Sequence, residues 1–542
     1  MKPLLMLLAL LSLKLPAQIL VNQSGYLAAE PGQIKAPPGQ TLLLKSASSD
    51  GIIATLSPPA DGWLSLPIGL GPGWYLLENE QHRSEVFPIG LDSQKQSLML
   101  LLRAFHYQHA GQPLLDPATG LRRPAAHLQD GRLAHDDDLH PQGHYLDASG
   151  GWYDAGDYGK YLATTTITAA RLLDAGQQAE SRDPLLAQAL IQEAQVGLDW
   201  LLKMQRLDGA FYRKVGGASW PELVPPHQDR QPRYIYGVST PDSAKASAVL
   251  AQAARQLMPA QPELGQRYLA AAESGWRWLQ SQPQQRIDWH PGDDGGSGPY
   301  IYNQWDQQPS LQHDRDDRFW AAAELFLTTG QADYLEYASQ HLPTTIGLFE
   351  WKDPSVMGVI HLLASSRAAP LHALLSERLL QRCRQLKTQA EASEFRIANQ
   401  RFIWGSNKMV AEQGILLAQC ASLSGDRRYR QLAWHQWHYL MGLNPFNQSF
   451  VTGLGARPVR NLHHIWARAA KVSPPGMMVG GPNEDSQASI APKGQGMLSY
   501  VDDARDYSVN EFAIDYNAAA IGLIGQLLHG PGPHPADTAA SH

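Results

Sequence analysis

Two distant stretches of the chain determine its fold and chemistry: Gly150-Gly-Trp-Tyr-Asp-Ala-Gly-Asp-Tyr-Gly-Lys-Tyr161 and Tyr500-Val-Asp-Asp-Ala-Arg-Asp-Tyr-Ser-Val-Asn-Glu-Phe-Ala-Ile-Asp-Tyr-Asn-Ala518. Each stretch places carboxylates among aromatic rings. Cleavage of a glycosidic bond requires one carboxyl group as acid, another as base, and flat faces on which sugars stack. The pair therefore indicates a site that cuts carbohydrate.

Composition excludes several other classes of protein. The chain has 542 residues, of which 43% are hydrophobic and 18% charged, so we expect a large folded core and two domains. Its net charge is -7, and basic residues form no stripe. Neither nucleic acid nor an anionic membrane is therefore an expected partner.

The N-terminus carries an apolar run after Lys2 and reaches Leu-Pro-Ala17. This pattern predicts a signal peptide over residues 1–17 and a secreted or periplasmic protein; a short apolar strand is the alternative. Elsewhere the chain has no uninterrupted apolar run long enough for a membrane span.

The remaining chain divides into a strand-like part and a helical part. Short apolar runs separated by Pro, Gly and Ser turns predict a β-sandwich over residues 18–92. Helical periodicity dominates residues 96–530 and predicts a closed array of helical hairpins. The predicted helices cover residues 97–109, 162–175, 185–204, 243–258, 264–280, 317–329, 371–386, 410–424, 429–441 and 513–528. Residues 531–542 are a polar tail for which we expect disorder.

Asp154 and Asp157 are the first candidate catalytic residues. The small residues between them allow a tight turn that brings both carboxylates to one side, where they can hold a water molecule. The ordinary alternative is that Asp157 caps the helix that follows. Trp152 and the neighbouring tyrosines add aromatic faces suited to sugars.

Glu511 is the candidate proton donor. Ser508 and Glu511 match a capping box, in which the glutamate would only satisfy a backbone N–H. The apolar helix that follows predicts instead a raised pKa, which keeps a carboxyl group protonated near neutral pH. Both roles are compatible.

Other polar residues have competing interpretations. Asp502 and Asp506 can brace their loop or bind an ion or substrate, and His463 and His464 can contact sugar hydroxyls, bind metal or pack within the loop. The two cysteines, Cys383 and Cys420, lie in predicted helices and are consistent with buried thiols or with one disulfide.

The chain resembles glycoside hydrolase family 9, the inverting β-1,4-glucanases, in the subgroup with an N-terminal immunoglobulin-like domain. The matching segments run nearly end to end, and residues 500–518 agree with the family's second signature at every position. The resemblance implies an immunoglobulin-like β-sandwich followed by an (α/α)6-barrel with an active groove across one face.

The resemblance also implies residue roles. Asp157 corresponds to the general base, Asp154 to its partner on the water, and Glu511 to the general acid. His463 and Tyr516 correspond to substrate contacts, and we count Trp152 and Asp502 as further candidates for substrate binding.

Several departures from the family pattern bear on substrate and ions. Ile465 stands where the first signature has arginine, and residues 301–315 form an insertion that could shorten the groove. Ala110 and Ala126 stand where relatives bind structural zinc through cysteines, so we expect no such zinc. The activity implied requires no cofactor; calcium, common in the family, remains a candidate ion, and residues 136–138 are either its ligands or a solvated loop.

Three functions remain open from the sequence. The first is hydrolysis of cellulose-type glucans or cellodextrins, and the second is exo-β-glucosaminidase action on chitosan oligosaccharides, favoured by the missing arginine and the insertion. The third is carbohydrate binding without catalysis, which would need none of the three carboxyl groups. The expected partner in each case is a β-linked saccharide.

Overall fold

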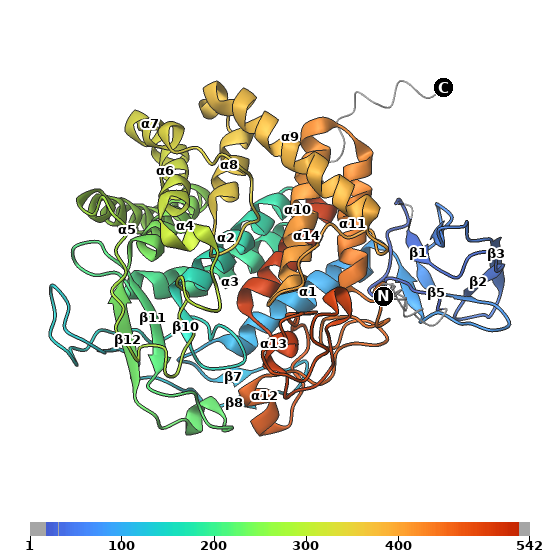
Figure 1. The fold of residues 1–542 in the computed structure, drawn as a ribbon, viewed down its shortest axis with the longest axis horizontal. Coiled ribbons are helices and arrows are strands. Elements are labelled where there is room, and N and C mark those ends of the chain that lie inside the picture. Colours follow the sequence, from blue (N-terminus) through green and yellow to red (C-terminus); the bar gives the residue numbers. More distant parts are fainter. Residues whose placement is uncertain (1–17, 31, 531–542) are drawn as a thin grey trace, which may run out of the picture.

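The computed structural model describes residues 18–30 and 32–530. The predicted signal peptide (1–17) and the predicted tail (531–542) lie outside the described residues. Figure 1 shows a small strand-rich domain beside a large helical one. The predicted order of a β domain followed by an α domain is confirmed.

Two antiparallel sheets form the N-terminal domain. One pairs β1 (Gln33–Lys35) with β4 (Trp63–Ser65); the other has the order β3 (Ile52–Leu56), β2 (Leu42–Ser46), β5 (Gly73–Glu78), β6 (Phe87–Ile89). Alternate residues of β2 point inward, and Leu42 and Leu44 are fully buried. They share a small hydrophobic core with Leu77 and Phe87, as expected of a β-sandwich.

Paired helices form the second domain. Within the described residues, six helices that are largely buried form an inner ring: α2 (Leu162–Ala179), α4 (Thr240–Leu257), α6 (Arg315–Thr329), α8 (Ser355–Ala364), α10 (Ser406–Ser424) and α14 (Ile514–His529). Six others cover them: α1 (Leu91–Gln108), α3 (Pro184–Lys203), α5 (Pro262–Ser281), α7 (Ala332–Gln340), α9 (Ala369–Ala392) and α11 (Arg427–Leu440). The last inner helix, α14, packs on both α10 and α2, and α9 links α8 to α10, so the ring closes into the expected (α/α)6-barrel.

Most of the inner helices are buried on nearly every side because each is enclosed by neighbours. Ala244, Ala248 and Ala251 of α4 are all fully buried, for example. The buried charged side chains of these helices pair with one another, as Arg171 of α2 does with Glu412 of α10 and Lys245 of α4 does with Asp317 of α6. The active-site groups described below lie mainly on the helix ends and loops.

The helical pattern is interrupted by a two-stranded pair, β7 (Leu114–Leu115) with β8 (Arg122–Arg123), and by a four-stranded sheet. Its order is β10 (Lys160–Tyr161), β11 (Tyr212–Gly217), β12 (Arg233–Val238), β9 (Arg132–Leu133). The sequence did not predict it, because these strands are short and rich in Lys, Arg and Gly. The strand β10 directly follows the Asp154–Asp157 turn and anchors it.

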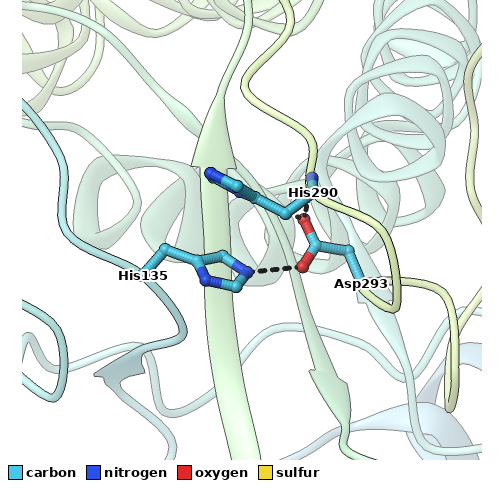
Figure 2. Close-up of side chains that lie close together, drawn as sticks. All are labelled: His135, His290 and Asp293. Atoms are coloured by element: carbon cyan, nitrogen blue, oxygen red, sulfur yellow. Dashed lines mark hydrogen bonds and ion pairs between the residues drawn. The ribbon is translucent and has the colours of Figure 1, made fainter.

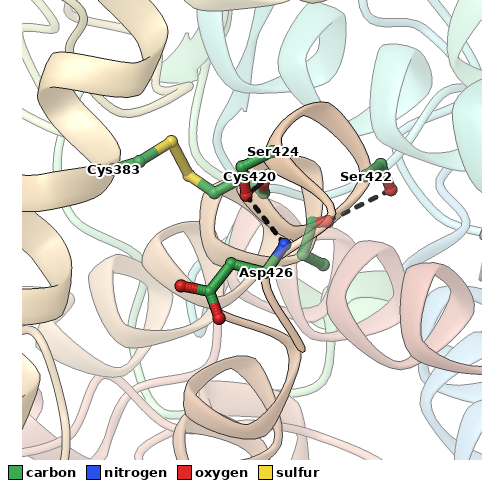
Figure 3. Close-up of a disulfide and its surroundings, with 6 residues drawn as sticks. Cys383, Cys420, Ser422, Ser424 and Asp426 are labelled. Atoms are coloured by element: carbon green, nitrogen blue, oxygen red, sulfur yellow. Dashed lines mark hydrogen bonds between the residues drawn. A yellow bond between two sulfur atoms is a disulfide. The ribbon is translucent and has the colours of Figure 1, made fainter. Parts of the chain in front are cut away.

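The two cysteines form a disulfide. Figure 3 shows Cys383 of α9 joined to Cys420 of α10, an outer helix to an inner one. The sequence left free thiols and a bridge open, and the structure decides for the bridge.

The β domain packs on the barrel through polar contacts that exclude water. The Gln94 side chain donates to the Gly25 carbonyl (2.6 Å) and accepts from the Trp437 indole (2.9 Å). Glu30 pairs with Arg430 at 2.6 Å. Gln94 and Trp437 are both fully buried, so this hydrogen-bonded contact lies inside a closed interface between the two domains.

No helix among the described residues is long and apolar enough to cross a membrane.

Candidate active site

Three loops from different parts of the chain meet at one end of the barrel. We call them the aspartate loop (residues 150–161), the histidine loop (449–464) and the glutamate loop (500–513). The Gly156 N–H donates to Glu511 Oε1 at 3.1 Å, and the Gly156 carbonyl accepts from Ile465 N at 2.7 Å. The Asp154 carbonyl accepts from Ile514 N at 2.8 Å. The two carboxyl-bearing loops predicted to converge therefore lie against each other.

Gly156 has no side chain because there is no room for one. A Cβ atom at this position would lie 2.7 Å from the His463 carbonyl oxygen and 2.9 Å from Glu511 Oε1. Any larger residue would therefore separate the aspartate loop from Glu511.

Asp154 is held rigidly at the base of the site. It is 2% exposed; one carboxylate oxygen accepts from the Thr164 hydroxyl, and the other accepts from the Tyr300 hydroxyl at 2.7 Å. Burial, assisted by the charge of Asp515, raises the pKa of Asp154 to about 7.

Asp157 is oriented by its own turn. Its carboxylate accepts from the Gly159 N–H at 2.5 Å. The following helix α2 begins after Tyr161 and receives no side-chain cap, so the alternative that Asp157 is a helix cap is wrong. Burial raises the pKa of Asp157, while the Arg233 and Lys214 charges work in the opposite direction.

Glu511 does not act as part of a helix-capping box. It follows the short helix α13 (Tyr507–Asn510), whose N-cap is Asp506, and the long helix α14 begins only at Ile514. Ser508 bonds to Asp506, so no capping box forms. Burial and the nearby charges of Asp157 and Asp154 raise the pKa of Glu511 well above its ordinary value.

Two of the predicted substrate contacts, His463 and Tyr516, lie beside the carboxyl groups. His463 lies beside Glu511 in a parallel β-bridge, with Nδ1 at 2.8 Å from the Ala504 carbonyl oxygen. Tyr516 lies on α14, and its hydroxyl approaches the indole of Trp404, a side chain 41% exposed. Both predicted residues therefore border the carboxyl groups.

The predicted substrate contact of Trp152 is wrong, and Asp502 is engaged by its own loop. Trp152 is fully buried, its indole N–H donates to Glu193 at 2.8 Å, and its ring packs on Phe105, so it belongs to the core. The Asp502 carboxylate accepts from the backbone N–H groups of Arg460 (2.9 Å) and Asn461 (2.8 Å). It also accepts from the side chains of Gln448 and Asn510, and so it braces the loops.

Metal binding by the adjacent histidines does not fit their geometry. His464 is buried, with Nε2 at 3.0 Å from the Gln108 side chain and Nδ1 accepting from Ala467 N. His463 bonds to a different partner, the Ala504 carbonyl, so the two rings serve separate contacts. Ala110 and Ala126, which stand where the resemblance implied zinc-binding cysteines, are buried residues whose methyl side chains carry no ligand atom.

The acidic run at residues 136–138 is engaged by the protein. Asp136 accepts from Gln142 N at 2.5 Å, Asp137 accepts from the Tyr212 hydroxyl at 2.5 Å, and Asp138 pairs with Arg286 at 2.8 Å. These contacts fit a braced loop better than a calcium site.

Two residues of the site were missed from the sequence. Tyr300 donates to Asp154, and its ring packs at 4.4 Å from Tyr161 and 4.9 Å from Trp351. Tyr300 lies just before the insertion 301–315, and that insertion is the sequence feature that could have drawn attention to it. Trp404 packs on Tyr507 at 5.6 Å and presents a half-exposed face; its signal was the Trp-Gly pair at a helix start.

Comparison with known proteins identifies the family. The model of glycosyl hydrolase family 9 matches residues 95–524, so the chain belongs to that family. Endoglucanase C of Cellulomonas fimi is 28% identical over 96% of this chain, and a cellulose 1,4-beta-cellobiosidase of Acetivibrio thermocellus is 27% identical over 83%. The chain spans only 53% and 58% of these two relatives. A crystal structure of a metagenome-derived family 9 endoglucanase has a TM-score of 0.86 and 34% identity, covering 95% of this chain and 99% of that one.

The raised pKa of Asp154 predicts a pH-dependent stability. Because the folded state holds this proton more tightly than the unfolded chain, the stabilisation is complete below about pH 4 and is lost as the pH rises through about 7. Asp154→Asn removes this titration. The decrease in the free energy of unfolding between pH 4 and pH 8 should therefore be smaller in this variant, by at most about 4 kcal/mol, at about 1.4 kcal/mol per pKa unit. Urea unfolding of both proteins at pH 4 and pH 8 measures the difference.

Asp503→Asn is the matched control. Asp503 is paired with Arg505, which holds its pKa at about 2, outside this pH range. The free energy of unfolding of this control should therefore decrease between pH 4 and pH 8 by the same amount as that of the wild type. An unchanged slope in Asp154→Asn would contradict the assignment of the raised pKa.

Proposed function

We propose that the chain hydrolyses internal β-1,4-glucosidic bonds of cellulose-type glucans and cellodextrins with inversion at the anomeric carbon. Glu511 protonates the leaving oxygen, Asp157 takes the proton of the attacking water, and Asp154 orients that water. The observation that carries the proposal is the hydrogen bond from the Gly156 N–H to Glu511 Oε1. It brings the proposed acid against the loop that carries the proposed base.

The electrostatics support this division of labour. A general acid must be protonated before the reaction, and burial beside two other carboxyl groups raises the pKa of Glu511 well above its ordinary value. The charges of Arg233 and Lys214 lower the pKa of Asp157 and favour its ionised form. One oxygen of Asp157 is fixed by Gly159, and in the proposal the other receives the proton from water.

The substrate is proposed from the surroundings of the carboxyl groups. Half-exposed aromatic rings at Trp404 and Tyr507 suit the apolar faces of glucose units. A cationic amino sugar would need a further carboxylate, but Asp515 pairs with Lys408 at 2.7 Å and Asp502 is used by its loop. These contacts favour glucan over the alternative of chitosan oligosaccharides.

Exo action is the second candidate, favoured by the insertion at residues 301–315. Asp306 pairs with Lys352 at 2.5 Å, which fixes the insertion beside Trp351, while Trp305 is 78% exposed. In this variant of the proposal the insertion forms a wall at one end of the groove.

Export is part of the proposal, since polymeric cellulose lies outside cells and residues 1–17 have the predicted features of a signal peptide. The two-carboxyl mechanism itself uses no cofactor. Calcium stays a prediction for structural support, to be tested by stability after chelation.

Changing the proposed acid and base should give different signatures. Glu511→Gln should lose about 10²–10⁴ in kcat on cellotetraose, the range of general acid catalysis. It should lose far less on 2,4-dinitrophenyl β-cellobioside, whose leaving group departs without a proton. Asp157→Asn should lose activity on both substrates, because water activation is needed in each case. Initial rates on the two substrates provide the test.

Asp503→Asn serves again as the control, since it removes a carboxylate of the glutamate loop whose partner is the exposed Arg505. It should retain wild-type rates. Equal losses on both substrates for Glu511→Gln would refute its role as acid, and activity retained in Asp157→Asn would refute the base.

The substrate assignment predicts a product pattern. Cellohexaose should be cut at internal bonds to mixed shorter oligomers, whereas chitosan hexamer should stay intact because no spare carboxylate receives its amino group. Chromatography of early products measures both. Release of glucosamine from the chain end would replace the glucan proposal by the exo-β-glucosaminidase, and binding without any turnover would favour the non-catalytic alternative.

A further inference from the structure

Two histidines and one aspartate gather away from the catalytic carboxyl groups. Figure 2 shows His135, on the loop after β9, facing Asp293, with His290 beside them on the loop after α5. His135 Nε2 lies 2.6 Å from Asp293 Oδ1, and His290 Nδ1 lies 3.9 Å from Asp293 Oδ2. The two imidazole rings are 4.0 Å apart, and one ligand atom from each residue falls within 4.8 Å of the others.

The carboxylate of Asp293 lacks a strong cation as partner. Its side chain is 2% exposed, and within the described chain it forms ion pairs with His135 and His290 and none with lysine or arginine. Its Oδ2 also accepts from the His290 backbone N–H at 2.9 Å. The neighbouring Lys214 pairs with Asp294 instead, at 2.7 Å. A buried carboxylate that faces two weak bases is well placed to receive a positive ion.

The ligand types select the ion. Two imidazole nitrogens and one carboxylate oxygen suit zinc and similar first-row divalent ions, whereas calcium prefers oxygen ligands. With ligand bonds of about 2.0–2.1 Å, tetrahedral zinc would hold its ligand atoms about 3.3 Å apart. His135 Nε2 lies 2.6 Å from one Asp293 oxygen and His290 Nδ1 lies 3.9 Å from the other, so coordination through a single oxygen requires side-chain rotation.

The site is open to solvent on one side. The side chains of His135 and His290 are 36% and 51% exposed, so an ion can enter and keep water as a fourth ligand. Asp136, Asp138 and Asp288 line the same hollow and make it acidic, although Arg286 pairs with two of them.

We propose that His135, His290 and Asp293 form a binding site for zinc or a similar divalent transition ion. The ion would join the loop after β9 to the loop after α5. The second loop continues to the catalytic carboxyl groups: Gly298 N donates to the Tyr161 hydroxyl at 2.7 Å, and Tyr300 donates to Asp154. The bound ion therefore fixes the base of the segment that positions Asp154.

Calorimetric titration of the purified full chain with Zn²⁺ tests the proposal independently of hydrolysis. The wild type should bind one ion, and His135→Gln and Asp293→Asn should each bind at least about tenfold more weakly. His144→Gln is the matched control, because His144 stacks on His140 at 4.4 Å in the same loop but lies outside the cluster. Its affinity for zinc should equal that of the wild type.

Hydrogen exchange gives a second measurement. Zinc should slow exchange of residues 288–300 in the wild type and not in His135→Gln, a variant at an exposed position that keeps the fold. The absence of zinc binding, equal affinity in all variants, or preference for Ca²⁺ over Zn²⁺ would each overturn the proposal. None of these results bears on the roles of Asp157 and Glu511.

Discussion

The hydrogen bond from the Gly156 N–H to Glu511 Oε1 is the contact on which the rest of the site depends. It joins residues separated by more than half of the chain. Two backbone bonds, from Ile465 to Gly156 and from Ile514 to Asp154, hold the same loops together. The approach is so close that only glycine fits at position 156. The barrel beneath brings the helix ends near enough for these bonds to form.

This arrangement concentrates three carboxyl groups whose charges repel one another in a buried place. Burial raises the pKa values of Asp154, Asp157 and Glu511, and the charges of neighbouring carboxylates raise those of Asp154 and Glu511 further. Such a site opposes folding near neutral pH, and the enclosing scaffold must offset the cost. The fully buried inner helices, the disulfide between α9 and α10 and the packed β domain supply that stability. The buried catalytic site therefore depends on the stability that the rest of the fold provides.

Much of this could be predicted from the sequence, and the failures have physical reasons. The long helices were predicted at the right places, because their apolar periodicity extends over many turns, although the start of α1 and the end of α9 were each missed by six residues. The short helices α7, α8, α12 (Ile465–Ala470) and α13 were missed, as was the β9–β12 sheet. Trp152 was misassigned because a motif shows which residues are present and not which way a ring points. Tyr300 reaches Asp154 only through tertiary packing, which spacing along the chain does not encode.

The central claim is that a proton donor and a water-activating carboxylate lie on opposite sides of one sugar linkage. Proton NMR of the first products released from cellotetraose tests it most directly, because attack by water on the face opposite the leaving group inverts the anomeric carbon. The account predicts that the new reducing end appears first as the α anomer and then mutarotates. Initial appearance of the β anomer would contradict the account, since it requires a carboxylate bonded to the sugar instead of a water held by Asp157.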